Sequence, residues 1–65
     1  MLPCERFQVL DSDGEQHYCY DYQYIRDQRL FICDTYIDGS YYMTEEVTKE
    51  DYITTWKENM KKLYE

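Results

Sequence analysis

The chain has 65 residues, enough for one small domain with a thin core. It contains 14 Asp and Glu and 7 Lys and Arg, and the resulting net charge of −7 disfavours direct binding to nucleic acid or to an anionic membrane surface. Disorder is also unexpected, because 43% of the residues are hydrophobic and 18% are aromatic, with nine Tyr among them.

The first predicted elements are two strands joined by a hairpin turn at residues 13–14, an Asp-Gly pair. Such pairs favour two-residue turns in which both central residues have positive φ. This turn would pair Phe7 with Tyr20 and place Arg6 opposite Asp21. Alternation along the strands then puts six residues on one face, namely Phe7, Val9, Tyr18, Tyr20, Tyr22 and Tyr24.

The connection from the second to the third strand is a short polar segment at residues 26–28. Its length decides which side chains of the third and fourth strands share the face of the tyrosines, because side chains alternate with a period of two. A two-residue loop would put Phe31, Cys33 and Ile37 on that face. A three-residue loop would instead put Leu30, Ile32, Tyr36, Tyr41 and Met43 there.

A second Asp-Gly pair, at residues 38–39, predicts another two-residue hairpin turn. It would pair Tyr36 with Tyr41 and Thr35 with Tyr42. The third and fourth strands should therefore be antiparallel neighbours.

The C-terminal segment predicts an amphipathic helix. Thr48 is suited to the N-cap and Asp51 to the third helical position, an approximate capping box. Val47 and Tyr52 occupy the two positions of a hydrophobic staple. The apolar stripe consists of Tyr52, Ile53, Trp56, Met60, Leu63 and Tyr64, and Trp56 and Met60 are expected in the core.

These elements predict an α+β fold, a small antiparallel β-meander of three to four strands packed against one C-terminal helix. The expected single domain spans 1–65, with strands at about 5–11, 15–25, 29–37 and 40–46 and a helix at about 49–64. One helix covers only one face of a sheet. Some aromatic surface should therefore remain for a partner or for a second copy of the chain.

Metal binding is not expected. Cys4, His17, Cys19 and Cys33 together would make a Cys₃His set, but they lack the closely spaced ligand pairs of structural zinc sites. Residues 11–14 resemble the start of a calcium loop, yet Gly comes fourth rather than sixth and the loop's final Glu is missing. We therefore predict no metal and no cofactor.

Catalysis is not expected either. The chain has one His and no G-x-S-x-G, P-loop or Gly-rich phosphate-binding motif. A nucleophilic pair of His17 and Cys19 would need a third orienting group and an oxyanion hole, for which the sequence offers no candidates. We predict that the protein is not an enzyme and has no catalytic residues.

The protein is expected in the cytoplasm with reduced thiols. Residues 1–6 contain no apolar run suited to a signal peptide, and the three Cys are odd in number. The longest apolar run, residues 30–33, is far shorter than the roughly 20 residues of a membrane span.

The excess of negative charge belongs to the predicted sheet. Residues 1–47 contain 10 acidic and 3 basic residues, whereas residues 48–65 contain 4 of each. In a meander the first and third turns lie at the same end, which would gather Asp11, Asp13, Glu15 and Asp38, with Lys61 and Lys62 of the returning helix nearby. Glu45 and Glu46 are expected at the other end. Such charge either serves solubility alone or forms a binding surface.

The tyrosines could likewise serve either the fold or a binding surface. Alternating aromatic residues can form a stacking platform for bases, but such platforms are interleaved with Lys and Arg, and here the intervening residues are Cys19, Asp21 and Gln23. A half-buried strand face is the favoured interpretation. Tyr is also enriched at protein interfaces.

The function that these features favour is that of a small acidic interaction protein. We predict an inhibitor that binds a basic, nucleic-acid-handling protein, as a nucleic-acid mimic of the anti-CRISPR or anti-defence type made by phages and acting in the host cytoplasm. The partner-binding residues would be Asp11, Asp13, Glu15, Asp38, Glu45 and Glu46 for charge and Tyr36, Tyr41 and Tyr42 as aromatic anchors. The alternative is a structural homodimer or accessory subunit that uses the second sheet face.

Overall fold

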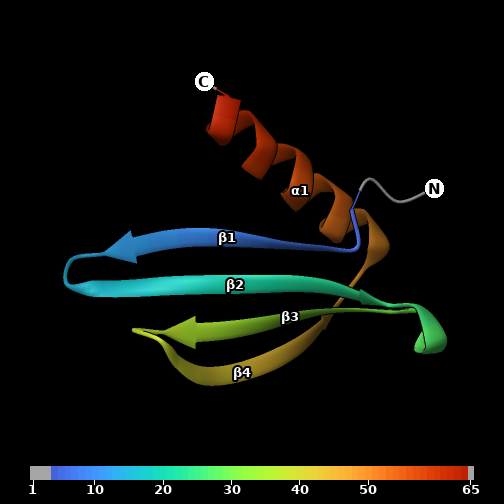
Figure 1. Ribbon diagram of the computed structural model, residues 1–65, viewed down its shortest axis with the longest axis horizontal. Helices are drawn as coiled ribbons and strands as arrows, with labels where there is room; N and C mark the ends of the chain where they lie inside the picture. Colours follow the sequence, from blue (N-terminus) through green and yellow to red (C-terminus); the bar gives the residue numbers. More distant parts are fainter. Residues whose placement is uncertain (1–3, 65) are drawn as a thin grey trace.

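The computed structural model describes residues 4–64 (Figure 1). In chain order the elements are β1 (Arg6–Asp13), β2 (Gln16–Ile25), the 3₁₀ turn η1 (Arg26–Gln28), β3 (Leu30–Ile37), β4 (Ser40–Val47) and α1 (Lys49–Tyr64). The strands form one antiparallel sheet in the order β1-β2-β3-β4. The predicted α+β meander with a C-terminal helix is therefore confirmed.

The β1–β2 hairpin turns one residue later than predicted, which shifts the pairing of its strands by two residues. Asp13 pairs with Gln16, so that Gly14 and Glu15 form the turn. Gly14 has a φ of 63°, whereas Asp13 and Glu15 stay outside the left-handed region. This is the pattern of a type II′ turn, with Gly at its first central position. In this turn Asp13 keeps a negative φ, whereas the predicted turn would have required a positive φ, which is unfavourable for a residue with a Cβ atom.

The later turn shifts the register but not the faces. Phe7 pairs with Tyr22 rather than with Tyr20, and Arg6 lies opposite Gln23 rather than Asp21. A shift of two residues leaves every side chain on its original face, because side chains alternate with a period of two. The predicted face of Phe7, Val9 and four tyrosines is thus retained.

The connection between β2 and β3 has four residues, 26–29, because Ile25 pairs with Leu30. It is longer than either loop considered from the sequence, and Arg29 closes it in the left-handed conformation with φ 52°. Four is an even number, so the faces are those of the two-residue alternative. Phe31, Cys33 and Ile37 lie opposite Tyr24, Tyr22 and Tyr18 respectively.

The β3–β4 hairpin turns at Asp38 and Gly39 as predicted, with φ values of 51° and 85° and Ile37 opposite Ser40. A β-bulge follows, which the sequence analysis did not predict. Tyr36 pairs with Tyr41, but Thr35 pairs with Met43 and not with Tyr42.

The bulge has a physical reason at the far end of β4. Because one extra residue is inserted at Tyr42, Val47 lies opposite Phe31 and Glu46 lies opposite Ile32. Without the bulge, Glu46 would take the place beside Phe31, and a charged side chain would face the aromatic core.

The core is an aromatic cluster between α1 and one end of the sheet. Tyr52 is fully buried, and its ring lies 5.1 Å from Phe7, 6.2 Å from Tyr22 and 5.0 Å from Phe31, measured between centroids. Its hydroxyl donates to the carbonyl of Cys4 at 3.0 Å. We call the sheet face that Tyr52 touches the helix face and the opposite one the open face.

The start of α1 follows the predicted capping. The N–H of Asp51 donates to Oγ1 of Thr48 at 3.1 Å, which satisfies one of the helix's free amides. With the helix fixed at this point, Tyr52 falls in its first turn and is directed into the core.

The second half of α1 is less buried than expected. The helix passes over one end of the sheet and extends beyond the edge of β1 (Figure 1). Trp56 and Met60, predicted in the core, are therefore only half-buried, and they line an open hollow of about 620 Å³. Leu63 is 68% exposed. The side chain of Tyr64, the last residue of the predicted stripe, lies outside the described part of the chain.

Among residues 4–64, no helix combines the length and the apolar character needed to cross a bilayer. The expectation about a signal peptide concerns residues 1–6, of which residues 1–3 lie outside the described part.

Candidate protein-binding surface

The β1–β2 and β3–β4 turns lie side by side at one end of the sheet. The N–H of His17 donates to Oδ1 of Asp38 at 2.9 Å, and the N–H of Asp38 donates to the carbonyl of His17 at 2.8 Å. These two bonds tie the second turn to the start of β2. They bring four of the predicted residues to one end, which we call the acidic end: Asp11, Asp13, Glu15 and Asp38, all exposed.

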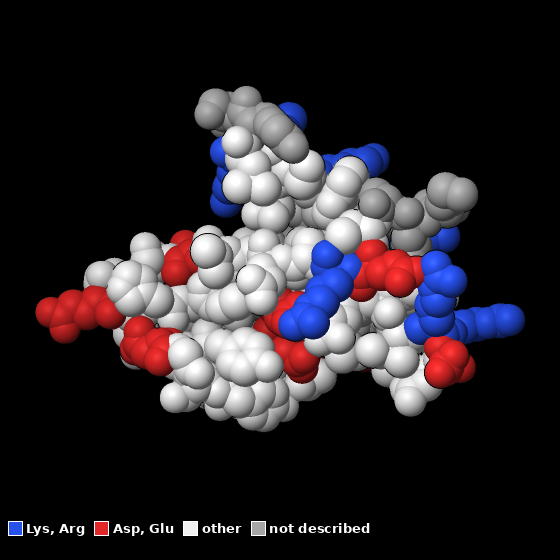
Figure 2. Space-filling view, in the orientation of Figure 1, with Lys and Arg blue, Asp and Glu red and all other residues white. Residues whose placement is uncertain are grey.

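The acidic end carries charge of a single sign. The segments 7–25 and 30–48, which form it, contain no Lys or Arg. Figure 2 shows acidic side chains alone at this end, on the left, while Lys and Arg lie over α1 and the right-hand part of the sheet. Charges of one sign add their fields and attract an oppositely charged partner.

No ion pair within residues 4–64 neutralises the acidic end. The ion pairs of this part of the chain are Arg6 with Asp21 and Arg26 with Glu5. Lys61 and Lys62, expected near the first cluster, form no ion pair with it.

Glu45 and Glu46 do not join the acidic end. Glu45 lies opposite Cys33 on the helix face, and Glu46 lies opposite Ile32 on the open face. Consecutive residues of a strand point to opposite faces, so these two carboxylates cannot act as one patch on either face.

The three predicted aromatic anchors lie on β3 and β4. Tyr36 and Tyr41 form an edge-to-face pair across the strands, with centroids 6.0 Å apart and an interplanar angle of 71°. Tyr41 is 61% exposed, and Tyr42, the extra residue of the bulge, is 64% exposed. Two large aromatic side chains are thus presented to solvent near the acidic end.

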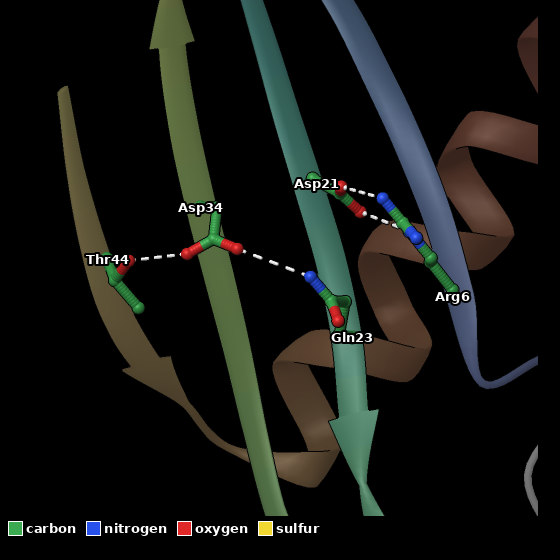
Figure 3. Close-up of polar contacts among 5 residues, drawn as sticks. All are labelled: Arg6, Asp21, Gln23, Asp34 and Thr44. Atoms are coloured by element: carbon green, nitrogen blue, oxygen red, sulfur yellow. Dashed lines mark hydrogen bonds and ion pairs between the residues drawn. The ribbon is translucent and has the colours of Figure 1, made fainter. Parts of the chain in front are cut away.

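The open face carries a row of polar contacts that crosses all four strands (Figure 3). Arg6 donates from Nε and Nη2 to the two oxygens of Asp21, at 3.1 and 2.7 Å. Gln23 Nε2 donates to Asp34 Oδ2 at 3.2 Å, and the hydroxyl of Thr44 donates to Asp34 Oδ1.

This row supplies hydrogen-bond donors to two carboxylates of the sheet, those of Asp21 and Asp34. Asp21 is only 3% exposed, and its hydrogen bond to Arg6 raises the pKa of the guanidinium. Asp34 is half-buried and shared between two donors. The Arg6–Asp21 pair had a sequence signal, because the two were predicted to face each other. The Asp34–Thr44 contact had none, since it depends on the bulge.

The sheet separates Cys33 from His17 and Cys19. His17, Cys19 and Asp21 all lie on the open face, whereas Cys33 is buried on the helix face beside Tyr22. Among residues 4–64 no three His, Cys, Asp or Glu are placed to hold a metal ion. Burial raises the pKa of the Cys33 thiol, which keeps it in its unreactive neutral form.

Comparisons of the chain with protein-family models, with curated proteins and with solved structures found no match. No residue role is therefore taken from a relative, and inference about function starts from the acidic end, the exposed tyrosines and the open face.

Proposed function

We propose that the protein binds a basic, nucleic-acid-handling protein and inhibits it by occupying its nucleic-acid groove. The observation that supports this function is the acidic end, four exposed carboxylates without an ion pair on segments that contain no cation. Carboxylates fixed on a sheet present negative charge to a groove lined with Lys and Arg, as phosphates do. Such complementarity speeds association and disfavours wrong partners.

The neighbouring exposed side chains would supply the apolar part of the contact. Leu10 is 74% exposed on β1, next to Asp11, and Tyr41 and Tyr42 are exposed on β4. Tyr is a frequent energetic hot spot of interfaces, because its large ring excludes water while its hydroxyl stays paired. A charged end flanked by aromatic side chains therefore suits a protein partner better than a small molecule.

This function needs no catalytic residue and no cofactor. In the proposed setting the protein is made by a phage, acts in the cytoplasm of the host and blocks a defence enzyme, as anti-CRISPR proteins do. The analogy rests on small size and acidity, so the partner has to be identified by experiment.

The test is capture of the partner by charge variants of the tagged protein. Asp11→Lys, Asp13→Lys and Glu15→Lys together reverse the acidic end, and the matched control reverses three exposed acids elsewhere: Asp27, Glu50 and Glu58. We expect the wild type and the control to retain a basic nucleic-acid-binding protein that duplex DNA or RNA displaces. The acidic-end variant should lose it while keeping its circular dichroism.

The outcome that contradicts the proposal is equal retention of the same protein by the acidic-end variant at low salt. Retention that added nucleic acid does not affect would also contradict it, because the proposed contact lies in the nucleic-acid groove.

The alternative function, a structural homodimer or accessory subunit, is favoured by one observation. α1 covers only the helix face, and the row of polar contacts lies on the face turned away from it (Figure 3). Sedimentation at micromolar concentration separates the two functions, since a stable dimer favours the alternative and a monomer favours a foreign partner.

A further inference from the structure

The two edges of the sheet differ in how they are protected. The edge at β1 is crossed by α1 (Figure 1), and Nδ2 of Asn59 donates to the carbonyl of Gln8 at 3.1 Å. The edge at β4 has no pairing strand within residues 4–64. Every residue from Ser40 to Glu46 is exposed. An uncovered edge of this length is a template for pairing with another chain.

The free backbone groups of β4 follow from the register. The N–H of Asp38 donates to the carbonyl of His17, and hydrogen-bonded pairs recur at every second position of the continuous β2–β3 pairing. The backbone groups of Asp34 therefore face β2. Thr44 lies opposite Asp34, so its own N–H and C=O point away from β3. The same holds for Glu46, two residues further along.

The usual devices that block an edge are weak here. Natural edges carry Lys or Pro, or they are short or bulged. β4 contains neither Lys nor Pro. Its bulge at Tyr42 distorts only the first half of the strand. Residues 43–47 remain as a regular stretch, in which the backbone groups of Thr44 and Glu46 point outward.

Charge decides which strand fits this stretch. Glu45 projects from the helix face and Glu46 from the open face, and neither forms an ion pair within residues 4–64. β3 and β4 contain no Lys or Arg. An added strand would meet a carboxylate on each face and no cation on either. Opposite charges on neighbouring strands stabilise a sheet, and like charges destabilise it.

We propose that the β4 edge binds an extended, basic segment of the partner as a fifth strand, in which two consecutive Lys or Arg residues face Glu45 and Glu46. This inference rests on the proposed function and adds to it the mode of contact, β-strand addition. It also gives Glu45 and Glu46 a shared role. They lie on opposite faces of the sheet, but they flank one edge.

A second copy of the chain is the other occupant of such an edge, and charge argues against it. Each chain has a net charge of −7, and pairing of β4 with β4 would bring the four glutamates of two chains together. A basic strand meets no such repulsion.

The probe is a short, terminally blocked peptide of alternating Thr and Val with a central Lys-Arg pair. We expect it to shift the NMR signals of residues 43–47 and to slow the hydrogen exchange of the outward-pointing amides, those of Thr44 and Glu46. Two control peptides carry a central Glu-Glu pair or N-methyl groups on the bonding edge. Both should bind about tenfold more weakly or not at all, because one loses the charge contacts and the other the backbone donors.

The matched variants are Thr44→Pro and Thr44→Val. Both lose the hydroxyl that donates to Asp34, but only Pro also removes the outward N–H. Thr44→Val should keep the affinity for the peptide, and Thr44→Pro should lose about tenfold. Should Thr44→Pro fail to fold, binding of the N-methylated peptide to the wild type tests the same backbone hydrogen bonding.

Three results overturn the proposal: no binding of the Lys-Arg peptide, equal binding of the N-methylated peptide, or a dimer of the chain that protects the amides of Thr44 and Glu46. Its failure is distinguishable from failure of the proposed function. A captured partner that depends on the acidic end yet binds Thr44→Pro and Thr44→Val equally refutes strand addition alone.

Discussion

Replacing Tyr52 tests whether the aromatic cluster holds the helix on the sheet. This side chain is fully buried, and its ring touches Phe7, Tyr22 and Phe31 at centroid distances of 5.0 to 6.2 Å. Truncating a buried aromatic side chain to Ala costs about 3–5 kcal/mol. A chain of 65 residues has a free energy of unfolding of about 3–10 kcal/mol. Tyr52→Ala should therefore remove a large share of the stability or all of it.

The Tyr52→Phe variant separates the ring from its hydroxyl. It keeps the ring contacts and loses only the hydrogen bond to the carbonyl of Cys4. That loss should cost about 0.5–1.5 kcal/mol. In a domain of this size, each 1 kcal/mol lowers the melting temperature by about 4–8 °C. Urea and thermal unfolding followed by circular dichroism measure both variants.

The matched control is Tyr42→Ala, because Tyr42 is 64% exposed and should change stability by less than about 0.5 kcal/mol. The reasoning is wrong if Tyr52→Ala costs as little as Tyr42→Ala. It is also wrong if Tyr52→Phe costs as much as Tyr52→Ala, because the stability would then come from the hydroxyl.

Three further outcomes follow from the structure. Burial raises the pKa of Tyr22 and Tyr52 to about 12, above the value of about 10 in the unfolded chain, so the unfolded chain loses protons first. The urea midpoint should therefore fall as the pH rises from about 10 to about 12, in addition to the loss that begins at about pH 8.5 because the pKa of the buried Cys33 thiol is also raised. Gly39→Ala should cost about 1–2 kcal/mol in thermal unfolding, because the residue has a φ of 85°. Cys33 is 3% exposed and should react with a thiol reagent more slowly than the half-buried Cys19; equal rates would contradict its placement.

Local patterns predicted the elements of this fold well. Period-two alternation placed the strands, the second Asp-Gly pair placed its turn, and Thr48 marked the start of the helix. The first Asp-Gly pair did not place its turn, because Gly also suits the first central position of a type II′ turn. A shift of two residues conserves the faces, so the predicted face of the sheet was right although the pairing was wrong. The prediction that Trp56 and Met60 lie in the core was wrong, because both are only half-buried.

The candidate surface could be predicted only in part. Meander topology is enough to bring the two turns together, so the acidic end was visible in the sequence. The bulge at Tyr42 was not visible, because it depends on the placement of the half-buried Val47 opposite Phe31, at the other end of β4. The bulge also sets Thr44 opposite Asp34, and it places Glu45 on the helix face and Glu46 on the open face. The role of the β4 edge therefore appears only in the structure.

The most direct test of the central claim is the salt dependence of the affinity between this protein and its purified partner. The dissociation constant of the wild type should rise steeply with salt concentration, because exposed charges are screened. With Asp11, Asp13 and Glu15 all replaced by Lys, binding at low salt should weaken strongly and the salt dependence should flatten. The variant with Lys at positions 27, 50 and 58 should behave like the wild type. Equal affinity and equal salt dependence of the acidic-end variant and the wild type would contradict the claim that the acidic end binds a basic partner.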